Sequence, residues 1–357
     1  MKEVVKEILV RSLRIGKDLK IYEKAESGWK ISKINKHKND EFPNAFEVIN
    51  LFRANGRFPE LVDKKDSRFL KGQLSPDGKT QGARINILPN GKKLDGAYSL
   101  FSKELTIHDQ MTHLHWDVIY KNPNGNFAYH YTLDKKKKAE SNKYKSVKEF
   151  EKKYPVLERN VLKSLEDRKD YMALPIFTLL KTYMRVGNEI YYKAHKHKGL
   201  ITLKKSDLRI KGDLVNFKYL GKDGVPQNIT KKFPEIYIKN LKSLLLGMKK
   251  EDFIFRNQQG NLLNENDFKK AFERYIGEGF YPHIVRSYFA TKQTEEFLKR
   301  HKKPRKEEVK SFLTYVAEEL GHKKFSKKKG CWEDSYSVTI AHYIQPELAE
   351  KLRGFCR

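Results

Sequence analysis

Apolar residues recur at helical spacing through most of the chain after residue 145. Within residues 146–168, such a stripe is formed by Val156, Leu157, Val161, Leu162 and Leu165. Ser146 precedes this stripe, and Glu149 follows Ser146 by three residues, a pair typical of a capping box at a helix start. We therefore predict a helix over residues 146–168, preceded by a linker at 139–145.

A second, more buried helix is predicted over residues 172–195, with Arg185 near its end. Short strand patterns follow it, at residues 200–205, 208–212 and 214–220. The next four residues, GKDG, form a typical tight turn, which places Lys222 at a hairpin tip. Further helices are predicted over residues 235–248, 265–280, 283–300, 307–320 and 338–355. This part of the chain should be mainly helical, with one small antiparallel sheet.

Residues 41–145 have another pattern, rich in aromatic residues, glycines and turn signals. A short helix closed by Gly56 is predicted over residues 46–56, and a strand over residues 83–93. The segments 116–120 and 127–131 flank Asn-Pro-Asn-Gly-Asn, which is a strong hairpin signal.

The second strand of this hairpin predicts a nucleic-acid contact. Strand side chains alternate, so Tyr129 and Tyr131 lie on one face. A lysine run that includes Lys135 and Lys136 follows directly. Aromatic and basic side chains in this order suit contacts to a DNA backbone. Equally, the tyrosines could pack the sheet beside a solvated lysine turn, and the pattern does not separate these interpretations.

These patterns predict an α+β fold with two domains. A mainly β, DNA-binding domain is expected over residues 41–145, and a mainly α-helical catalytic domain over residues 146–357. Residues 1–40 are lysine-rich and are predicted to form a basic appendage, with helical spacing over 1–13 and a loose stretch over 28–40. A solvated tail is the alternative for this segment.

The charge of the chain points to a polyanionic partner. Its 357 residues contain 74 Lys and Arg but 45 Asp and Glu, a net charge of +29. Basic surfaces of this kind bind nucleic acids because each neutralised phosphate releases counterions. A lysine-rich solubilising surface is the other interpretation, and composition does not separate DNA from RNA.

Other composition features exclude several classes of protein. Cys331 and Cys356 are the two cysteines, so no disulfide framework is implied, and an intracellular, reducing location is expected. No spacing of cysteines or histidines suggests a metal site. The sequence has neither the apolar core of a signal peptide at its start nor a run as long as a membrane span, so no membrane partner is expected.

Five residues in the second domain have the chemistry needed to transfer a phosphodiester without a metal. They are Arg185, Lys222, Arg286, His322 and Tyr343. Arginines grip phosphate oxygens in a bidentate manner. Lysine and histidine donate protons or hydrogen bonds, and tyrosine forms a reversible phosphate ester. Each residue alone would be read as an ordinary surface or core residue. Their order and local context give the set its weight.

The segments that carry these residues resemble the type IB DNA topoisomerases, in particular the small poxviral and bacterial forms. The similar segments are YHYTLDKKKKAESNKYKSVKEF, TYMRVGNEIYY, GLITLKKSDLRIKGDLVNFKYLGKDGV, HIVRSYFAT, VAEELGH and HYIQPEL. The resemblance implies a monomeric clamp on double-stranded DNA that cleaves one strand through a 3′-phosphotyrosyl link, lets the duplex swivel and religates it. It implies no ATP, metal or other cofactor.

The resemblance also implies residue roles. Arg185 and Arg286 would hold the scissile phosphate, Lys222 would protonate the 5′ oxygen, His322 would bond a non-bridging oxygen and Tyr343 would attack. Further DNA contacts are expected from Tyr129, Tyr131, Lys135, Lys136, Tyr191, Lys204 and His283.

Two features depart from the family pattern. His283 stands where the small topoisomerases usually have lysine, and His-x-x-Arg is instead a feature of the related tyrosine recombinases. His322 and Tyr343 are 21 residues apart, about twice the usual separation. The insert at 323–337 is basic and aromatic, and it contains Tyr336, a competing nucleophile. We prefer Tyr343 because the segment Tyr-Ile-Gln-Pro-Glu-Leu matches the family ending. The alternatives are a tyrosine site-specific recombinase and a DNA-binding protein without activity.

Overall fold

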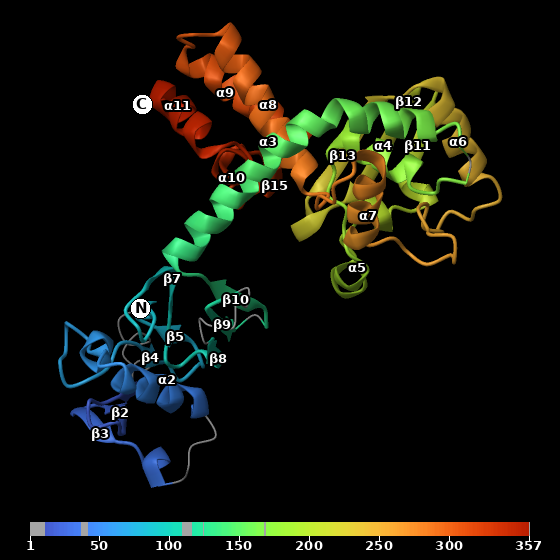
Figure 1. Cartoon of the computed structure of the whole chain (residues 1–357). Coiled ribbons are helices and arrows are strands. Elements are labelled where there is room, and N and C mark those ends of the chain that lie inside the picture. The colour runs from blue at the N-terminus through green and yellow to red at the C-terminus, as the bar shows by residue number, and fades with distance from the viewer. Residues whose placement is uncertain (1–10, 37–41, 109–115, 124, 168, 357) are drawn as a thin grey trace. The chain divides into compact units, whose positions relative to one another are not determined.

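The computed structural model describes residues 11–36, 42–108, 116–123, 125–167 and 169–356 (Figure 1). The chain divides into two compact units, Met1–Asn142 and Lys143–Arg357. Most of the segment predicted as a helix over residues 1–13 lies outside the described residues. Strands dominate the first unit, and helices with small antiparallel sheets make up the second, as expected for the α+β class.

The first unit contains an antiparallel sheet in the order β3-β2-β1-β4-β5. Its strands are β1 (Leu13–Ile15), β2 (Ile21–Ala25), β3 (Gly28–Ile31), β4 (Gln73–Leu74) and β5 (Thr80–Gln81). Leu13, Ile15 and Ile21 are buried in the hydrophobic core of this unit, together with residues of helix α2 (Pro43–Ala54). The structure thus differs from the separate appendage predicted for residues 1–40, because apolar side chains of β1 and β2 complete this core.

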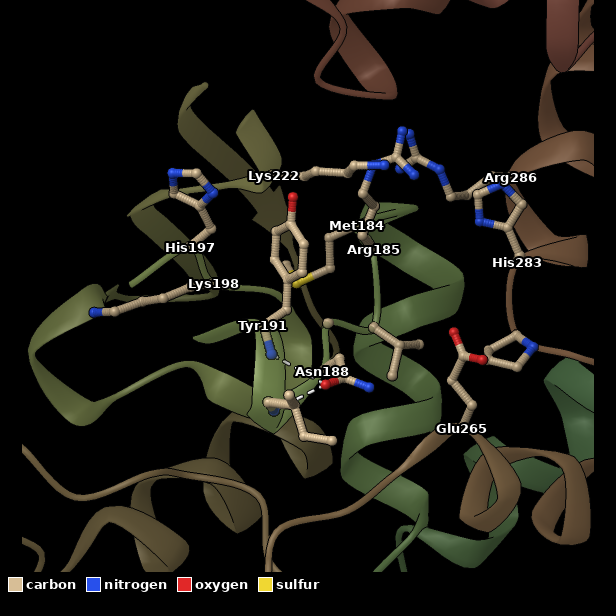
Figure 2. A pocket seen from close by; sticks show the side chains of 14 residues that line it. Met184, Arg185, Asn188, Tyr191, His197, Lys198, Lys222, Glu265, His283 and Arg286 are labelled. Carbon is tan, nitrogen blue, oxygen red and sulfur yellow. Dashed lines mark hydrogen bonds between the residues drawn. The ribbon is translucent and has the colours of Figure 1, made fainter. Parts of the chain in front are cut away.

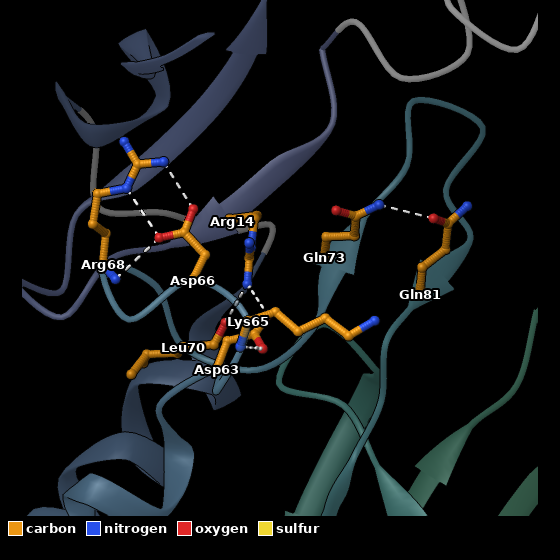
Figure 3. Close-up of polar contacts among 8 residues, drawn as sticks. All are labelled: Arg14, Asp63, Lys65, Asp66, Arg68, Leu70, Gln73 and Gln81. Carbon is orange, nitrogen blue, oxygen red and sulfur yellow. Dashed lines mark hydrogen bonds and ion pairs between the residues drawn. The ribbon is translucent and has the colours of Figure 1, made fainter.

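A buried arginine ties β1 to the chain that follows α2. Arg14 donates from Nη2 to Asp63 Oδ2 at 2.5 Å and to the Leu70 carbonyl oxygen at 3.2 Å (Figure 3). Nearby, Gln73 Nε2 donates to Gln81 Oε1 at 2.8 Å across β4 and β5. A charge removed from water needs such partners, so these bonds hold β1 within the unit.

The remaining strands of the first unit form two smaller sheets. One pairs β6 (Ile85–Ile87) with β7 (Lys93–Tyr98), and the other has the order β10-β9-β8. The latter strands are β8 (Lys103–Ile107), β9 (Val118–Lys121) and β10 (Phe127–His130). The predicted hairpin around Asn-Pro-Asn-Gly-Asn is confirmed by the antiparallel pairing of β9 and β10. Tyr131 lies one residue beyond β10.

Helix α3 (Leu133–Ser164) contains the boundary between the two units. The predicted linker at 139–145 and the predicted helix start at Ser146 are both wrong, since the helix begins thirteen residues earlier. The segment before Ser146 has no glycine or proline and is rich in lysine, which favours helix. The buried residues of α3 are Tyr144, Val147, Phe150, Leu157 and Val161.

The helix predicted over residues 172–195 is two helices, α4 (Ala173–Thr182) and α5 (Glu189–His195). Tyr183 ends α4 in the left-handed region at φ 52°. Asn188 starts α5 by accepting hydrogen bonds from the backbone of Ile190 and Tyr191 at 2.8 and 3.2 Å. Arg185 therefore lies in the irregular segment between the two helices, and not inside a helix as predicted.

Two glycines allow this segment to pack against the chain that follows α5. Leu200 N donates to the Arg185 carbonyl oxygen at 2.9 Å, and Ile201 N to that of Val186 at 2.9 Å. A Cβ atom at Gly199 would lie 2.6 Å from Gly187 Cα and 2.7 Å from the Arg185 oxygen. The strand predicted over 200–205 is absent from these described residues, and short 3₁₀ turns are present at Leu200–Thr202 and Lys205–Asp207.

A three-stranded antiparallel sheet, β11 (Leu208–Lys211), β12 (Leu214–Leu220) and β13 (Pro226–Lys232), follows. Lys222 lies in the turn between β12 and β13, which confirms the predicted hairpin tip. Helices α6 (Glu235–Leu245) and α7 (Glu265–Ile276) come next, and a core shared with α3 and α4 covers the sheet residues Val215 and Phe217.

The last part of the second unit has its own apolar cluster, formed by α8 (Ile284–Arg300), α9 (Lys306–Glu319), α10 (Ser337–His342) and α11 (Pro346–Cys356). The hairpin of β14 (Lys323–Ser326) and β15 (Cys331–Asp334) separates α9 from α10. The helix predicted over 338–355 is broken between α10 and α11, because Pro346 lacks the N–H that a continuous helix requires. In the described part of the chain, no helix is long and apolar enough to cross a membrane.

We expect Gly199→Ala to lower the free energy of unfolding by about 1–3 kcal/mol, the usual cost of overpacking. The new methyl group would press on the backbone of Gly187 and Arg185, which cannot move aside as a flexible side chain can. Thermal unfolding of the whole chain, followed by the helical circular dichroism signal, measures this loss. Gly354→Ala in α11 is the matched control, because no atom lies within 4 Å of its new Cβ. Equal losses in both variants would contradict the role assigned to the glycine contact.

Candidate active site

Three of the predicted cationic residues line one cavity of about 490 Å³ in the second unit. Arg185 comes from the α4–α5 segment, Lys222 from the β12–β13 turn and Arg286 from the first turn of α8. Figure 2 shows their charged groups gathered at one rim, with the Tyr191 hydroxyl pointing toward it. His283 also lines this cavity.

A second, smaller cavity of about 130 Å³ shares this cationic rim. Arg185, Lys222 and Arg286 line it together with His322 and Lys323. Residues that lie far apart in the sequence thus meet around two adjoining hollows. A concave, positively charged surface of this kind suits a phosphate group.

Arg286 is the most constrained of these residues, with 1% of its surface exposed. Its guanidinium donates to the Tyr183 carbonyl oxygen, to the Leu320 carbonyl oxygen at 2.8 Å and to His322 Nε2 at 2.9 Å. Burial lowers the pKa of Arg286 from its ordinary value, yet an arginine remains charged in proteins. Its Nε atom is buried without a hydrogen-bond partner, which leaves one donor for a ligand.

The contacts of His322 define which ring nitrogen carries the proton. Burial, and then the charges of Arg286 and Arg185, lower the pKa of His322 to about 2, so the ring is neutral at pH 7. Arg286 can only donate, so His322 Nε2 accepts its hydrogen bond. The hydrogen is therefore on Nδ1, which donates to Thr339 Oγ1 at 2.8 Å.

Tyr343 lies in the break between α10 and α11 and is 3% exposed. The centre of its ring is 4.7 Å from that of His322, 5.3 Å from that of His283 and 5.1 Å from Arg286 Cζ. Burial raises the pKa of the Tyr343 phenol, but the positive charges of Arg286 and Arg185 outweigh it, and the pKa is below its ordinary value. The surroundings therefore favour the phenolate, the form that acts as a nucleophile.

His283 is a second neutral histidine beside this phenol. Burial, followed by the charges of Arg286 and Arg185, lowers the pKa of His283 to about 3. The ring is therefore uncharged at pH 7 and adds no positive charge to the cavity.

Some predicted residues lie elsewhere in the second unit. Lys204 pairs with Glu251 at 2.6 Å and lines neither cavity. Tyr336, the competing nucleophile, is half-buried at the start of α10 against the apolar cluster of α8–α11. Tyr343, not Tyr336, therefore has the ring contacts with Arg286 and His322.

The DNA contacts predicted in the first unit have mixed surroundings. Tyr129 is 51% exposed, whereas Tyr131 is half-buried. Lys135 and Lys136 form ion pairs at 3.2 Å with Asp117 and Asp95. These two lysines are thus held by carboxylates of their own unit.

Sequence reasoning missed three residues around Tyr343 and His322. Lys143 Nζ lies 5.5 Å from the centre of the Tyr343 ring, Tyr144 donates to the Ile344 carbonyl oxygen at 2.7 Å, and Thr339 orients His322. Lys143 and Tyr144 fall in the segment that we predicted to be a linker. The apolar spacing of Tyr144, Val147 and Phe150 was the signal that this segment belongs to a helix.

Among the described residues, no group of three or more His, Cys, Asp or Glu side chains is placed to hold a metal ion.

The sequence matches a family model and a viral protein. The sequence model of the family described as eukaryotic DNA topoisomerase I, catalytic core, matches residues 132–343. DNA topoisomerase 1B of Acanthamoeba polyphaga mimivirus is 24% identical over 209 residues. This match covers 54% of the chain and 62% of the viral protein, so the chain spans less than two thirds of that relative.

Two solved structures show weaker likenesses. A pre-cleavage complex of the XerH site-specific recombinase bound to difH has a TM-score of 0.32 and 23% identity, over 48% of this chain and 50% of that chain. The XerA recombinase has a TM-score of 0.31 and 19% identity, over 47% and 53%. Scores this low carry no argument about the fold or its use.

The match to the family model extends over more than half of the 357 residues. The matched range includes Arg185, Lys222, Arg286, His322 and Tyr343. The chain therefore belongs to the family of the eukaryotic DNA topoisomerase I catalytic core.

Proposed function

We propose that the chain is a type IB DNA topoisomerase, which relaxes supercoiled double-stranded DNA through a transient 3′-phosphotyrosyl link, without ATP or a metal. The observation that carries this proposal is the burial of Tyr343 against Arg286 and His322, beside cavities lined by Arg185 and Lys222. A phenol whose pKa is lowered by neighbouring cations is suited to attack a phosphate that the same cations bind.

In the proposed reaction, Tyr343 Oη attacks the phosphorus atom and gives its proton to water. The bond between phosphorus and the 5′ oxygen breaks, and Lys222 gives that oxygen a proton. Arg185 and Arg286 neutralise the charge that grows on the non-bridging oxygens, with the Arg286 Nε–H as one available donor. Religation is the reverse: the 5′ hydroxyl returns its proton and displaces the phenol. The two ester bonds are similar in energy, so no ATP is needed.

The role proposed for His322 requires its proton to move from one ring nitrogen to the other. A hydrogen bond from Nε2 to a non-bridging oxygen needs the proton on Nε2, whereas here Nε2 accepts from Arg286. A bound phosphate that takes the Arg286 donors would release Nε2 for the other tautomer. Thr339 Oγ1 suits this exchange, because a hydroxyl both accepts and donates.

Contacts to double-stranded DNA beyond the scissile phosphate are part of the proposal. In the first unit, exposed Tyr129 would contact the sugar-phosphate backbone, with Tyr131, Lys135 and Lys136 beside it. In the second unit, Tyr191 and His283 line the larger cavity. Lys204 would bind DNA only by leaving Glu251. We propose that one chain acts alone as a clamp on the duplex.

A tyrosine site-specific recombinase is the second candidate. The observation that favours it is His283, three residues before Arg286, in contact with Tyr343 and lining the larger cavity. A recombinase exchanges strands between two specific sites, whereas a topoisomerase relaxes a plasmid that has no such site. The relaxation assay below therefore separates the candidates.

We expect the wild-type chain to relax both positively and negatively supercoiled plasmid in EDTA without ATP, and to form a covalent adduct on a denaturing gel. Tyr343→Phe should abolish both, because it removes the nucleophilic oxygen. Tyr336→Phe is the matched control and should retain both. A requirement for Mg²⁺ or ATP would refute the proposed chemistry. An adduct formed by Tyr343→Phe but not by Tyr336→Phe would move the nucleophile to Tyr336.

We expect Lys222→Ala to slow cleavage by about 10²–10⁴-fold, the usual loss on removal of a general acid or charge-stabilising donor. The loss should largely disappear on DNA with a sulfur in place of the 5′-bridging oxygen, because a thiolate leaves without protonation. Single-turnover cleavage of both substrates measures this. Lys218→Ala, an exposed lysine of β12, is the control and should cleave both normally. If the Lys222→Ala defect is equal on both substrates, Lys222 is not the acid.

A further inference from the structure

The backbone at Tyr343 needs support from outside its own helices. Tyr343 ends α10, a helix of six residues, and α11 begins at Pro346. Carbonyl groups in the last turn of a helix have no partner within that helix. A short helix that stops at the nucleophile therefore leaves its position to other contacts.

Side chains from two other helices supply these contacts at three successive carbonyl groups. Lys143 Nζ of α3 donates to the His342 oxygen, and Thr291 Oγ1 of α8 donates to the Tyr343 oxygen at 3.3 Å. Tyr144 OH of α3 donates to the Ile344 oxygen at 2.7 Å in a buried bond. Two adjacent residues of α3 thus hold the carbonyl groups on either side of the nucleophile.

Lys143 also contacts the aromatic ring that carries the nucleophilic oxygen. Its Nζ atom lies 5.5 Å from the centre of the Tyr343 ring and 5.0 Å from that of Tyr144. Among its causes, the lowered pKa of Tyr343 includes the charge of Lys143, after burial and the two arginines. The same ammonium group therefore fixes the backbone and favours the phenolate.

We infer that Lys143 and Tyr144 are positioning residues for the nucleophile: α3 holds the turn between α10 and α11 so that Tyr343 faces the phosphate site. This inference rests on the proposed role of Tyr343. Tyr144 acts through geometry alone, since its hydroxyl bonds a backbone oxygen. Lys143 acts through geometry and charge. Neither residue touches the DNA phosphate in this assignment.

The inference also gives α3 a part in control of cleavage. The helix begins at Leu133 in the first unit, and Lys143 is the first residue of the second. The bonds to the Tyr343 turn thus start at the point where the helix passes from one unit to the other. If the helix unwinds there, both bonds are lost at once, and of the three bonds to the turn only the one from Thr291 of α8 remains.

Three variants test the inference in the full chain. Lys143→Met removes the charge but keeps the length of the side chain, and it should slow single-turnover cleavage by roughly 10²-fold, the effect of a misplacement of about 1 Å. Because the Lys143 charge lowers the pKa of Tyr343, its loss raises that pKa, and the rise of the cleavage rate with pH should move to higher pH. Lys143→Arg should restore most of the rate and the wild-type profile. Tyr144→Phe should slow cleavage without moving the profile.

Lys145→Met is the matched control, because it removes an exposed charge from the same helix. It should leave the rate of single-turnover cleavage at saturating protein unchanged. Melting curves of every variant show whether the fold persists. If the wild-type chain forms no adduct, the proposed function fails. If it forms one, and folded Lys143→Met and Tyr144→Phe cleave at the wild-type rate with the wild-type pH profile, the inference alone is overturned.

Discussion

The second unit is organised around the burial of one guanidinium group. A cation that is withdrawn from water must be paired or fully hydrogen-bonded. Arg286 meets most of this demand with carbonyl groups from the end of α4 and the end of α9, and with His322, while its Nε atom has no partner. Segments far apart in the sequence are fixed relative to one another by these bonds, and the Tyr343 ring lies against the same group. The demand of a single buried charge thus sets the positions of a candidate nucleophile and its histidine.

The positive charge of the site has two opposite effects on its neighbours. After burial, which is the larger cause, it lowers the pKa of His283 and of His322, since a second cation nearby would be repelled. It also favours the negative form of Tyr343 against the effect of burial. The site therefore holds neutral imidazoles and an ionisable phenol around fixed cations, a combination that suits the proposed phosphate transfer without a metal.

Local patterns predicted the parts of the fold that are decided locally. Alternating residues around a strong turn gave the β9–β10 hairpin, and the GKDG turn placed Lys222 correctly. The wrong predictions of helix bounds arose where tertiary contacts determine the local structure. The sequence near Arg185 contains no local signal that Gly187 packs against Gly199, so one helix was predicted where α4 and α5 are present. Residues 139–145 were predicted to be a linker because the partners of Lys143 and Tyr144, the carbonyl groups beside Tyr343, lie about 200 residues away. The five candidate residues came from order and resemblance, but the tautomer of His322 required coordinates.

The unusual separation of 21 residues between His322 and Tyr343 is explained by the contacts that hold each of the two residues independently. Arg286 and Thr339 hold the histidine, and α3 and α8 hold the tyrosine turn. Between them, β14 and β15 return the chain to its starting point, where Ser335 N donates to the His322 carbonyl oxygen at 3.3 Å. When the two ends of a loop are held together in this way, extra residues add little to the entropic cost of closing it. The connector is therefore a place where this architecture can gain or lose length in evolution while His322 and Tyr343 keep their places.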